Sequence, residues 1–468
     1  MTWTFQQIAE ITGGRVAAGR GELRSGPIRT DTRTIEPGAT FLALRGNRFD
    51  GHRFAGEALQ REAGGLILAD LAVLPAAAAS LPVSVVEVAD TLRGLHALAR
   101  AARRRPELRV VGITGSVGKT TTTAVVAAAL AALGPVTATR GNWNNLVGLP
   151  LSMLELTAES RFGVFELGTN RPREIAELAA IAEPDAGIIT AIGPAHLEFL
   201  GTEEGVFREK VALLESLPRT GWAILPAGSR WVRRLRERAP GPACAVGRGP
   251  RADVRWQLAG RDGNGWRVRF SDRQLGWQAT GWVPGLAAHV AEAAAMALAL
   301  ASRWGGDVAA ALAALARAPL PPMRMERHEI GGVTWIDDSY NANPSSMRAA
   351  LEVLSNLPCT GRRILVVGDM LELGPASPRY HAQLGRLIRG YSFGAVFGCG
   401  PAARRTLAEL GPPAGSTAGG YAESVDRLVE QVLDFVRPGD LVLVKASRGV
   451  GLDRLVRAAR QREAVAVG

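Results

Sequence analysis

VVGITGSVGKTTTTAVVAAAL, from Val110 to Leu130, is the stretch that decides the fold. A β-branched apolar run breaks into three glycines at three-residue spacing, followed by Lys119, four threonines and an Ala/Val-rich run. This order predicts a buried strand, a tight loop and a helix. In such a loop, backbone N–H groups and the positive end of the helix hold a phosphate, and the lysine neutralises it.

The loop departs from the strict form G-x-x-x-x-G-K-[ST], because Gly112 stands six positions before Gly118 rather than five. An ordinary glycine-rich turn is therefore the alternative interpretation. We favour a nucleotide phosphate site, since the lysine-threonine pair falls where the helix begins. The residues expected to bind the phosphates are Gly115, Ser116, Gly118, Lys119, Thr120 and Thr121.

Lysine is rare in this chain. Of the 55 basic residues, 52 are arginines, and the three lysines are Lys119, Lys210 and Lys445. The bias most simply reflects pressure on the genome toward arginine. Arginine is permanently charged, whereas the amine of lysine can be deprotonated and modified. The three remaining lysines therefore suggest places where arginine cannot substitute, and the alternative is that they survived by chance.

The bulk composition favours a soluble protein of several domains with a polyanionic small substrate. At 468 residues the chain is long for one core, and its 47% hydrophobic and 21% charged residues are ordinary for a globular protein. The net charge of +11 would suit nucleic acid. Because the arginines are spread along the chain, we expect no nucleic-acid partner.

Secretion and membrane insertion are not indicated. The start, MTWTFQQIAEITGG, lacks the basic residues and apolar core of a signal peptide, and the apolar segment from Leu286 to Ala301 predicts a buried helix. Three scattered cysteines fit a reducing compartment. We expect a cytoplasmic monomer.

Alternating strand-like and helix-like segments predict an α/β protein of three units: residues 1–105, 106–318 and 319–468. The central unit is expected to contain a mostly parallel sheet with an antiparallel meander attached near residues 252–282. Its predicted strands are 109–113, 163–167, 186–191 and 222–225. Those of the third unit are 333–336, 363–367, 394–397 and 441–444.

A carboxylate after the loop suggests a metal site, whereas the histidine and lysine that follow it are not a recognised metal-binding pair by themselves. Glu166 ends a predicted strand, where a carboxylate can ligate Mg²⁺. His196 and Lys210 follow, 14 residues apart. Because an ammonium repels a cation, Lys210 would serve only as a carbamate formed with CO₂. The alternative is a surface lysine that pairs with Glu209 or Glu215.

Seven segments together resemble the Mur ligase family. They are GITGSVGKTTT, GNWNNLVGLP, FELGTN, AHLEFLG, DDSYNANPSSM, VVGDMLELG and VLVKASRG, and DDSYNANP is the most specific. The resemblance spans nearly the whole chain, from Asp31 to Lys445. It implies an N-terminal domain that holds a UDP-sugar, a central P-loop ATPase domain and a C-terminal Rossmann-like domain that closes over the site.

The resemblance also implies roles for individual residues. Lys119, Glu166, His196 and a carbamylated Lys210 would be catalytic, with ATP and Mg²⁺ as cofactors. The further positions implied are Asn142, Asn144 and Asn145 near substrate or phosphate, Arg324, Asp338, Asn341 and Asn343 at the nucleotide, and the segment Asp31–Arg33 with Arg48 and His52 near the uridine.

Some positions depart from the family pattern. Ala212 replaces an acidic residue that many relatives carry two places after the modified lysine, and Ala446 stands where glycine is usual. The segment ending in His289 lacks the asparagines expected beside adenine. Position 291 is also predicted to lie at the nucleotide site, and its residue is Ala291.

The implied reaction is an ATP-dependent ligation in peptidoglycan precursor synthesis. The carboxylate of UDP-N-acetylmuramoyl-tripeptide attacks the γ-phosphate of ATP, and the amine of D-alanyl-D-alanine then attacks the acyl phosphate. The family member that adds the third amino acid is the nearest alternative, but its DNPR segment is absent. A nucleic-acid-stimulated P-loop ATPase is a more distant one.

Overall fold

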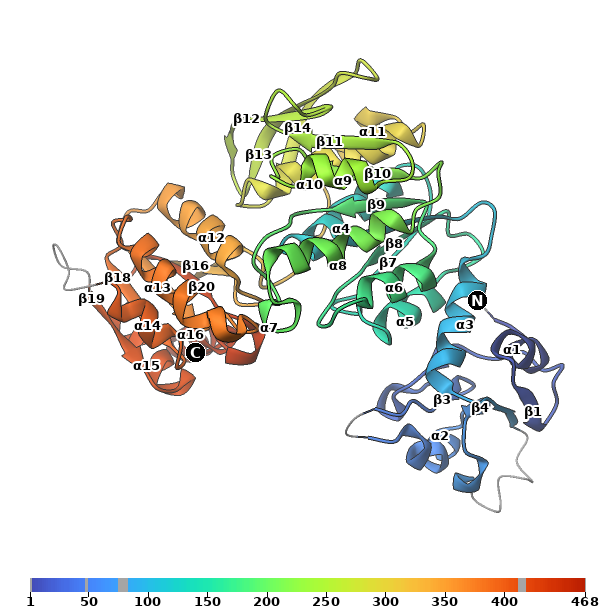
Figure 1. Cartoon of the computed structure of the whole chain (residues 1–468). Helices are drawn as coiled ribbons and strands as arrows, with labels where there is room; N and C mark the ends of the chain where they lie inside the picture. Colours follow the sequence, from blue (N-terminus) through green and yellow to red (C-terminus); the bar gives the residue numbers. More distant parts are fainter. Residues whose placement is uncertain (1, 47–48, 75–82, 411–417, 468) are drawn as a thin grey trace.

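The computed structural model describes residues 2–46, 49–74, 83–410 and 418–467. Three sheets follow one another along the chain, each with its own helices (Figure 1). The predicted α/β fold, with three domains and mostly parallel sheets, is confirmed.

The first sheet has the strand order β1-β5-β4-β3-β2, and only β1 runs antiparallel to its neighbour. Its strands are β1 (Arg15–Ala18), β2 (Ile28–Arg29), β3 (Thr40–Leu42), β4 (Gly65–Leu68) and β5 (Ser84–Glu87). Its helices are α1 (Phe5–Thr12), α2 (Ala55–Gln60) and α3 (Thr91–Arg103). At the end of α3, Arg103 forms a 2.8 Å ion pair with Asp185 of the second domain. This contact fixes the connection between the two domains.

The second sheet has nine strands in the order β14-β13-β12-β11-β10-β9-β6-β8-β7. The strands are β6 (Arg109–Thr114), β7 (Val136–Ala138), β8 (Phe162–Glu166), β9 (Ala186–Ile189), β10 (Trp222–Pro226), β11 (Ala243–Gly247), β12 (Val254–Asp262), β13 (Gly265–Asp272) and β14 (Gln278–Pro284). The parallel part runs from β6 to β12, and β12, β13 and β14 form the predicted antiparallel meander. The four predicted strands are confirmed, although the third ends at Ile189.

Helices cover both faces of the parallel part of this sheet, which explains its nearly continuous apolar strands. They are α4 (Lys119–Ala131), α5 (Gly148–Leu154), α6 (Glu174–Ala182), α7 (Leu197–Leu200), α8 (Glu203–Glu215), α9 (Val232–Arg238), α10 (His289–Arg303) and α11 (Val308–Leu315). The alanine-rich α10 packs beside α4 in the largest core cluster, as its sequence predicts. Among the described residues, no helix has the length and apolar character needed to cross a membrane.

The third sheet has the order β15-β16-β20-β17-β18-β19, with β15 antiparallel and the rest parallel. Its strands are β15 (Glu326–Ile330), β16 (Val333–Asp337), β17 (Arg363–Gly368), β18 (Ala395–Cys399), β19 (Ala418–Ala422) and β20 (Leu441–Lys445). Its helices are α12 (Pro344–Asn356), α13 (Ser377–Ile388), α14 (Ala403–Ala408), α15 (Val425–Phe435) and α16 (Asp453–Val467). The last strand, β20, lies between β16 and β17. The segments DDSYNANP and VLVKASRG, which include the ends of β16 and β20, therefore lie side by side at the carboxyl edge of this sheet.

A buried ion pair ties the meander to α10 and yields a stability prediction. Arg303 Nη1 lies 2.6 Å from Asp272 Oδ2, and the two side chains are 1% and 0% exposed. Asp272→Ala leaves a buried guanidinium without its counter-charge, so we expect a loss of about 3–5 kcal/mol in urea unfolding followed by circular dichroism.

The control for this prediction is Asp262→Ala in the same meander. Asp262 pairs with Arg267 at 3.1 Å, and both side chains are at least half exposed. We expect a loss below about 1 kcal/mol. Similar losses in the two variants would contradict the prediction.

Candidate active site

The phosphate loop joins β6 to α4 beside a cavity of about 390 Å³ between the second and third sheets. Gly118 is the N-cap residue of α4, with a φ of 84°, and a Cβ on Gly115 would come within 1.9 Å of Thr190 Oγ1. Lys119 Nζ donates to the Gly115 carbonyl at 3.0 Å. Of the predicted loop residues, Ser116, Gly118, Lys119, Thr120 and Thr121 line the cavity. Gly115 instead allows the loop to lie close to the end of β9.

Glu166 occupies the carboxyl end of β8 and is 2% exposed. The Thr120 hydroxyl donates to Glu166 Oε2 at 2.8 Å, and Asn144 Nδ2 donates to Oε1 at 2.7 Å. A carboxylate and a hydroxyl this close can share one Mg²⁺, an ion that takes oxygen ligands and usually keeps water and phosphate among them. Within the described ranges, His, Cys, Asp and Glu side chains form no group of three or more that could hold a metal ion. The residues present therefore fit an Mg²⁺ ion that one or two protein groups hold together with a bound nucleotide.

Lys210 projects from α8 into the interior and is 0% exposed. Its Nζ has no hydrogen-bond partner in the part of the chain that the structure describes. Burial, and then the charge of Lys119, lower the pKa of Lys210 well below its ordinary value. The surface-lysine interpretation is therefore wrong.

The two glutamates proposed as partners of Lys210 are engaged elsewhere. Glu209 accepts the N–H groups of Arg173 and Ile175 at 2.6 and 2.7 Å and the hydroxyl of Thr169 at 3.2 Å. It thereby fixes the loop before α6, which borders the cavity. Glu215 pairs with an arginine of α9.

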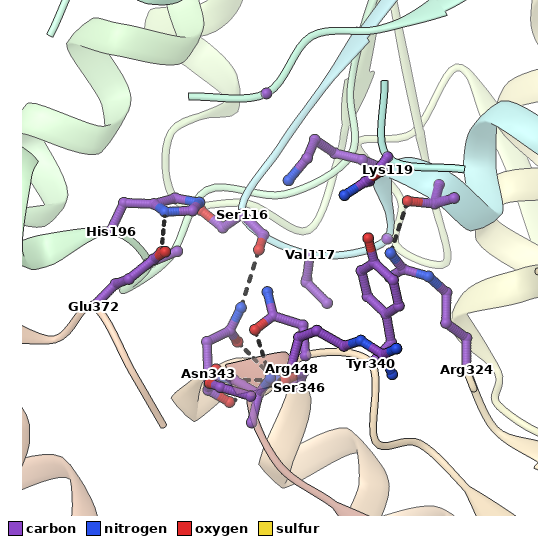
Figure 2. A pocket seen from close by; sticks show the side chains of 18 of the residues that line it. Ser116, Val117, Lys119, His196, Arg324, Tyr340, Asn343, Ser346, Glu372 and Arg448 are labelled. Atoms are coloured by element: carbon purple, nitrogen blue, oxygen red, sulfur yellow. Dashed lines mark hydrogen bonds and ion pairs between the residues drawn. The ribbon is translucent and has the colours of Figure 1, made fainter. Parts of the chain in front are cut away.

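His196 lies just before α7 and lines the cavity. Its Nδ1 is 2.6 Å from Oε2 of Glu372, which belongs to the third domain (Figure 2). Burial lowers the pKa of His196, and the hydrogen bond from His196 lowers the pKa of Glu372. Both pKa directions favour a neutral imidazole beside an ionised carboxylate.

The third domain also contacts the phosphate loop directly. Arg324 Nη2 donates to Thr120 Oγ1 at 2.8 Å, and Asn343 Nδ2 donates to the Ser116 carbonyl at 3.0 Å (Figure 2). Arg324 also stacks on Tyr340, 4.2 Å from the ring centre. The cavity is thus bordered by residues of both domains.

Asp338 and Asn341 line the same cavity, and both contact Lys445. Lys445 Nζ donates to Asp338 Oδ2 at 2.6 Å and to the Asn341 carbonyl at 2.8 Å. Unlike Lys210, this buried lysine has a counter-charge.

Comparison with known proteins identifies the family. The chain is 33% identical to UDP-N-acetylmuramoyl-tripeptide–D-alanyl-D-alanine ligase of Bacillus subtilis over 466 residues, which is 97% of each protein. It belongs to the Mur ligase family. It is 31% identical to the Escherichia coli ligase of the same name, with 98% of each chain covered. Models of the Mur ligase catalytic, middle and glutamate ligase domains match residues 27–105, 113–273 and 323–448.

Solved structures with Mur ligase names show the same architecture. A crystal structure of MurF from Acinetobacter baumannii superimposes with a TM-score of 0.88 at 29% identity, over 98% of this chain and 99% of that one. MurF ligase from Thermotoga maritima in complex with ADP gives 0.80 at 27% identity, over 93% and 97% of the two chains.

Three asparagines were expected near substrate or phosphate. Asn142, Asn144 and Asn145 all line the cavity. Asn145 Oδ1 accepts the N–H groups of Val147 and Gly148, so it also holds the start of α5. Their contact with substrate stays a prediction.

The nucleotide assignment at position 291 is wrong. Ala291 is 0% exposed within α10 and belongs to the core cluster, so it presents no group to the cavity. His289, two residues earlier, does line the cavity.

The residues expected near the uridine lie in the first domain. Arg33 pairs with Asp31 at 2.6 Å at the surface. His52 is 1% exposed, with Nδ1 2.6 Å from Asp50 and Nε2 accepting the N–H of Ala69 at 2.9 Å. Both of its ring nitrogens therefore organise the loop. Arg48 lies outside the described residues.

Sequence reasoning missed Glu372, Tyr340 and Glu209. Glu372 belongs to the segment MLELG, and Tyr340 belongs to DDSYNANP. Because both segments carry the family resemblance, they could have indicated these two residues. Glu209 had been considered only as a surface partner of the lysine beside it.

The close approach of Gly115 to Thr190 gives a test of the loop. Gly115→Ala places a methyl group where Thr190 Oγ1 lies, so the loop must shift. We expect at least about a 10-fold weaker affinity for ADP by calorimetry, the equivalent of ~1.4 kcal/mol of overpacking.

Gly228→Ala is the matched control, because a Cβ there meets no atom within 4 Å. Its ADP affinity should equal that of the wild type. Unchanged ADP binding by Gly115→Ala would contradict the loop geometry described above.

Proposed function

We propose that this protein is the ATP-dependent ligase that joins D-alanyl-D-alanine to UDP-N-acetylmuramoyl-tripeptide in peptidoglycan precursor synthesis. One observation carries the proposal: Lys119, the Glu166–Thr120 pair and His196 surround a single cavity that two domains close. The names of the relatives support the choice of substrates. The segment DDSYNANP supports the final step over the preceding one.

The first step brings two anions together, because a peptide carboxylate must approach a phosphate. Lys119 and the N-terminal end of α4 would bind the outer phosphates and offset their charge. Glu166 and Thr120 would hold Mg²⁺, which supplies further screening of negative charge when it is bound. Positioning of the carboxylate in line with the phosphate accounts for much of the remaining rate.

The acyl phosphate formed in the first step must be kept from water until the dipeptide amine attacks. Arg324 and Asn343 of the third domain contact the phosphate loop at 2.8 and 3.0 Å. Such contacts close the cavity over the reacting groups. This explains why the third domain contributes residues to a cavity whose proposed catalytic groups come from the second domain.

Lys210 would take part as a carbamate. Its neutral amine attacks CO₂, an N–C bond forms, and one proton leaves to solvent. The product is an anion with two oxygens, which replaces an unpartnered buried amine by a group that can ligate Mg²⁺ beside Glu166. The burial of the amine supports this chemistry, because only the neutral form reacts.

We also propose the domain limits, the oligomeric state and the location of the protein. The units are residues 1–105, 106–318 and 319–468, and the first would bind the UDP-sugar. The family models fall within these limits. A monomer in a reducing cytoplasm is also proposed, and the three scattered cysteines support that compartment.

The function predicts a defined substrate dependence. Phosphate release from ATP should require UDP-N-acetylmuramoyl-tripeptide and D-alanyl-D-alanine together with Mg²⁺, and removal of the metal by a chelator should abolish it. The measurement is phosphate release with each component omitted in turn.

Two outcomes would contradict the proposal. Phosphate release that is indifferent to the dipeptide but depends on a single amino acid would indicate the preceding ligase. Stimulation by DNA or RNA in place of the peptide substrates would indicate a nucleic-acid-dependent ATPase.

A further inference from the structure

Glu372 and His196 connect the third domain to the second at the edge of the cavity. Glu372 lies four residues after β17, and His196 lies between β9 and α7. The side chains meet at 2.6 Å, and the N–H of Glu198 donates to the Glu372 carbonyl at 3.1 Å. Both the side chain and the backbone of Glu372 therefore bind the same turn of the second domain.

The backbone is strained on both sides of this contact. His196 has a φ of 54° and Glu372 a φ of 62°, in the left-handed region that residues other than glycine seldom adopt. Such conformations carry an energetic cost and cluster at functional sites. The contact is also close, because a Cβ on Gly374 would come within 2.9 Å of the Glu198 Cα. The fold thus holds these two side chains together at a cost in backbone energy.

The pairing determines which ring nitrogen carries the hydrogen. A carboxylate only accepts hydrogen bonds, so Nδ1 of His196 must donate. In a neutral ring this leaves the lone pair on Nε2. Burial, and then the positive charge of Lys119, oppose a charged His196 ring.

We infer that Glu372 is a positioning residue: it is supplied by the third domain and fixes His196 of the second domain in the tautomer whose Nε2 lone pair is available to the cavity. A metal-binding histidine commonly donates its other N–H to a carboxylate in this way. The inference rests on the proposed function, because that function places Mg²⁺ and a nucleotide in the cavity, where the Nε2 lone pair could bind the ion. Its consequence is that His196 has the correct tautomer only when the two domains are in contact.

A purely structural clasp is the competing interpretation. A clasp would hold the domains together but would leave the tautomer of His196 unspecified. The two roles therefore differ in the state of the ring nitrogens, which can be measured without activity.

The experiment uses full-length protein labelled with ¹⁵N-histidine, with ADP present and Mg²⁺ absent. Two-bond ¹H–¹⁵N spectra report the protonation of each ring nitrogen, and the chain has only six histidines. His196→Gln assigns the signals. The variant is Glu372→Ala, whose native side chain is 44% exposed and so contributes little to the core. The matched control is Glu198→Ala, which removes an exposed carboxylate from the same contact and keeps the backbone bond.

In wild type and in Glu198→Ala we expect Nδ1 to be protonated and Nε2 to be bare. In Glu372→Ala we expect the tautomer with hydrogen on Nε2 to become the major form. The Mg²⁺ concentration for half-maximal phosphate release should rise about 10- to 100-fold in Glu372→Ala alone. Urea midpoints should agree among the three proteins.

An unchanged tautomer in Glu372→Ala overturns the inference, even if activity falls, because Glu372 would then be a clasp. A wild-type ring with hydrogen on Nε2 also overturns it. If the protein shows no ligase activity, the proposed function fails, and the nitrogen spectra still decide the role of Glu372.

Discussion

The Lys210 amine is buried without a partner in the described structure, close enough to Lys119 and Glu166 for their charges to act on it. An isolated buried ammonium costs several kcal/mol, so the group is better neutral or chemically changed. The neighbouring carboxylate cannot relieve it, since Glu209 receives three hydrogen bonds from the loop before α6. Helix α8 thus presents two adjacent polar side chains with separate duties. Glu209 fixes a loop at the cavity, and Lys210 is the proposed site of carbamate formation.

The remaining parts of the site come from strand ends that meet across two domains. Glu166 and the phosphate loop come from the second sheet, while Asp338 and Lys445 come from the third. Parallel strands bring their carboxyl ends to one edge, and loops at that edge can converge on a ligand. The interdomain contacts through Arg324, Asn343 and Glu372 then complete the cavity. Closure and catalysis are therefore linked by shared residues.

The sequence was sufficient for features that are encoded locally. The change from a strand pattern to a helix pattern at Gly112 to Lys119 predicts the loop, and alternating segments predict the sheets. The meander was predicted by its turn near Gly263, where φ is 58°. Glu166 was predicted because it follows a strand directly.

Contacts between distant parts of the chain could not be predicted in the same way. Glu372 lies 176 residues from His196, and no local pattern joins them. His52 resembles a ligand-binding histidine in sequence, but its burial and its two hydrogen bonds depend on how the loop folds. The side chain of Ala291 gave no support for a nucleotide contact, and the packing of α10 shows that it lies in the core.

The state of the Lys210 amine is the most direct test of this account. Protein equilibrated with ¹³C-bicarbonate near neutral pH should show a carbamate signal by ¹³C NMR, because the lowered pKa of Lys210 leaves neutral amine available to CO₂. Lys210→Ala should lose that signal, while any carbamate on the chain's N-terminal amine would remain in both proteins. Identical carbamate spectra from wild type and Lys210→Ala would contradict the central claim.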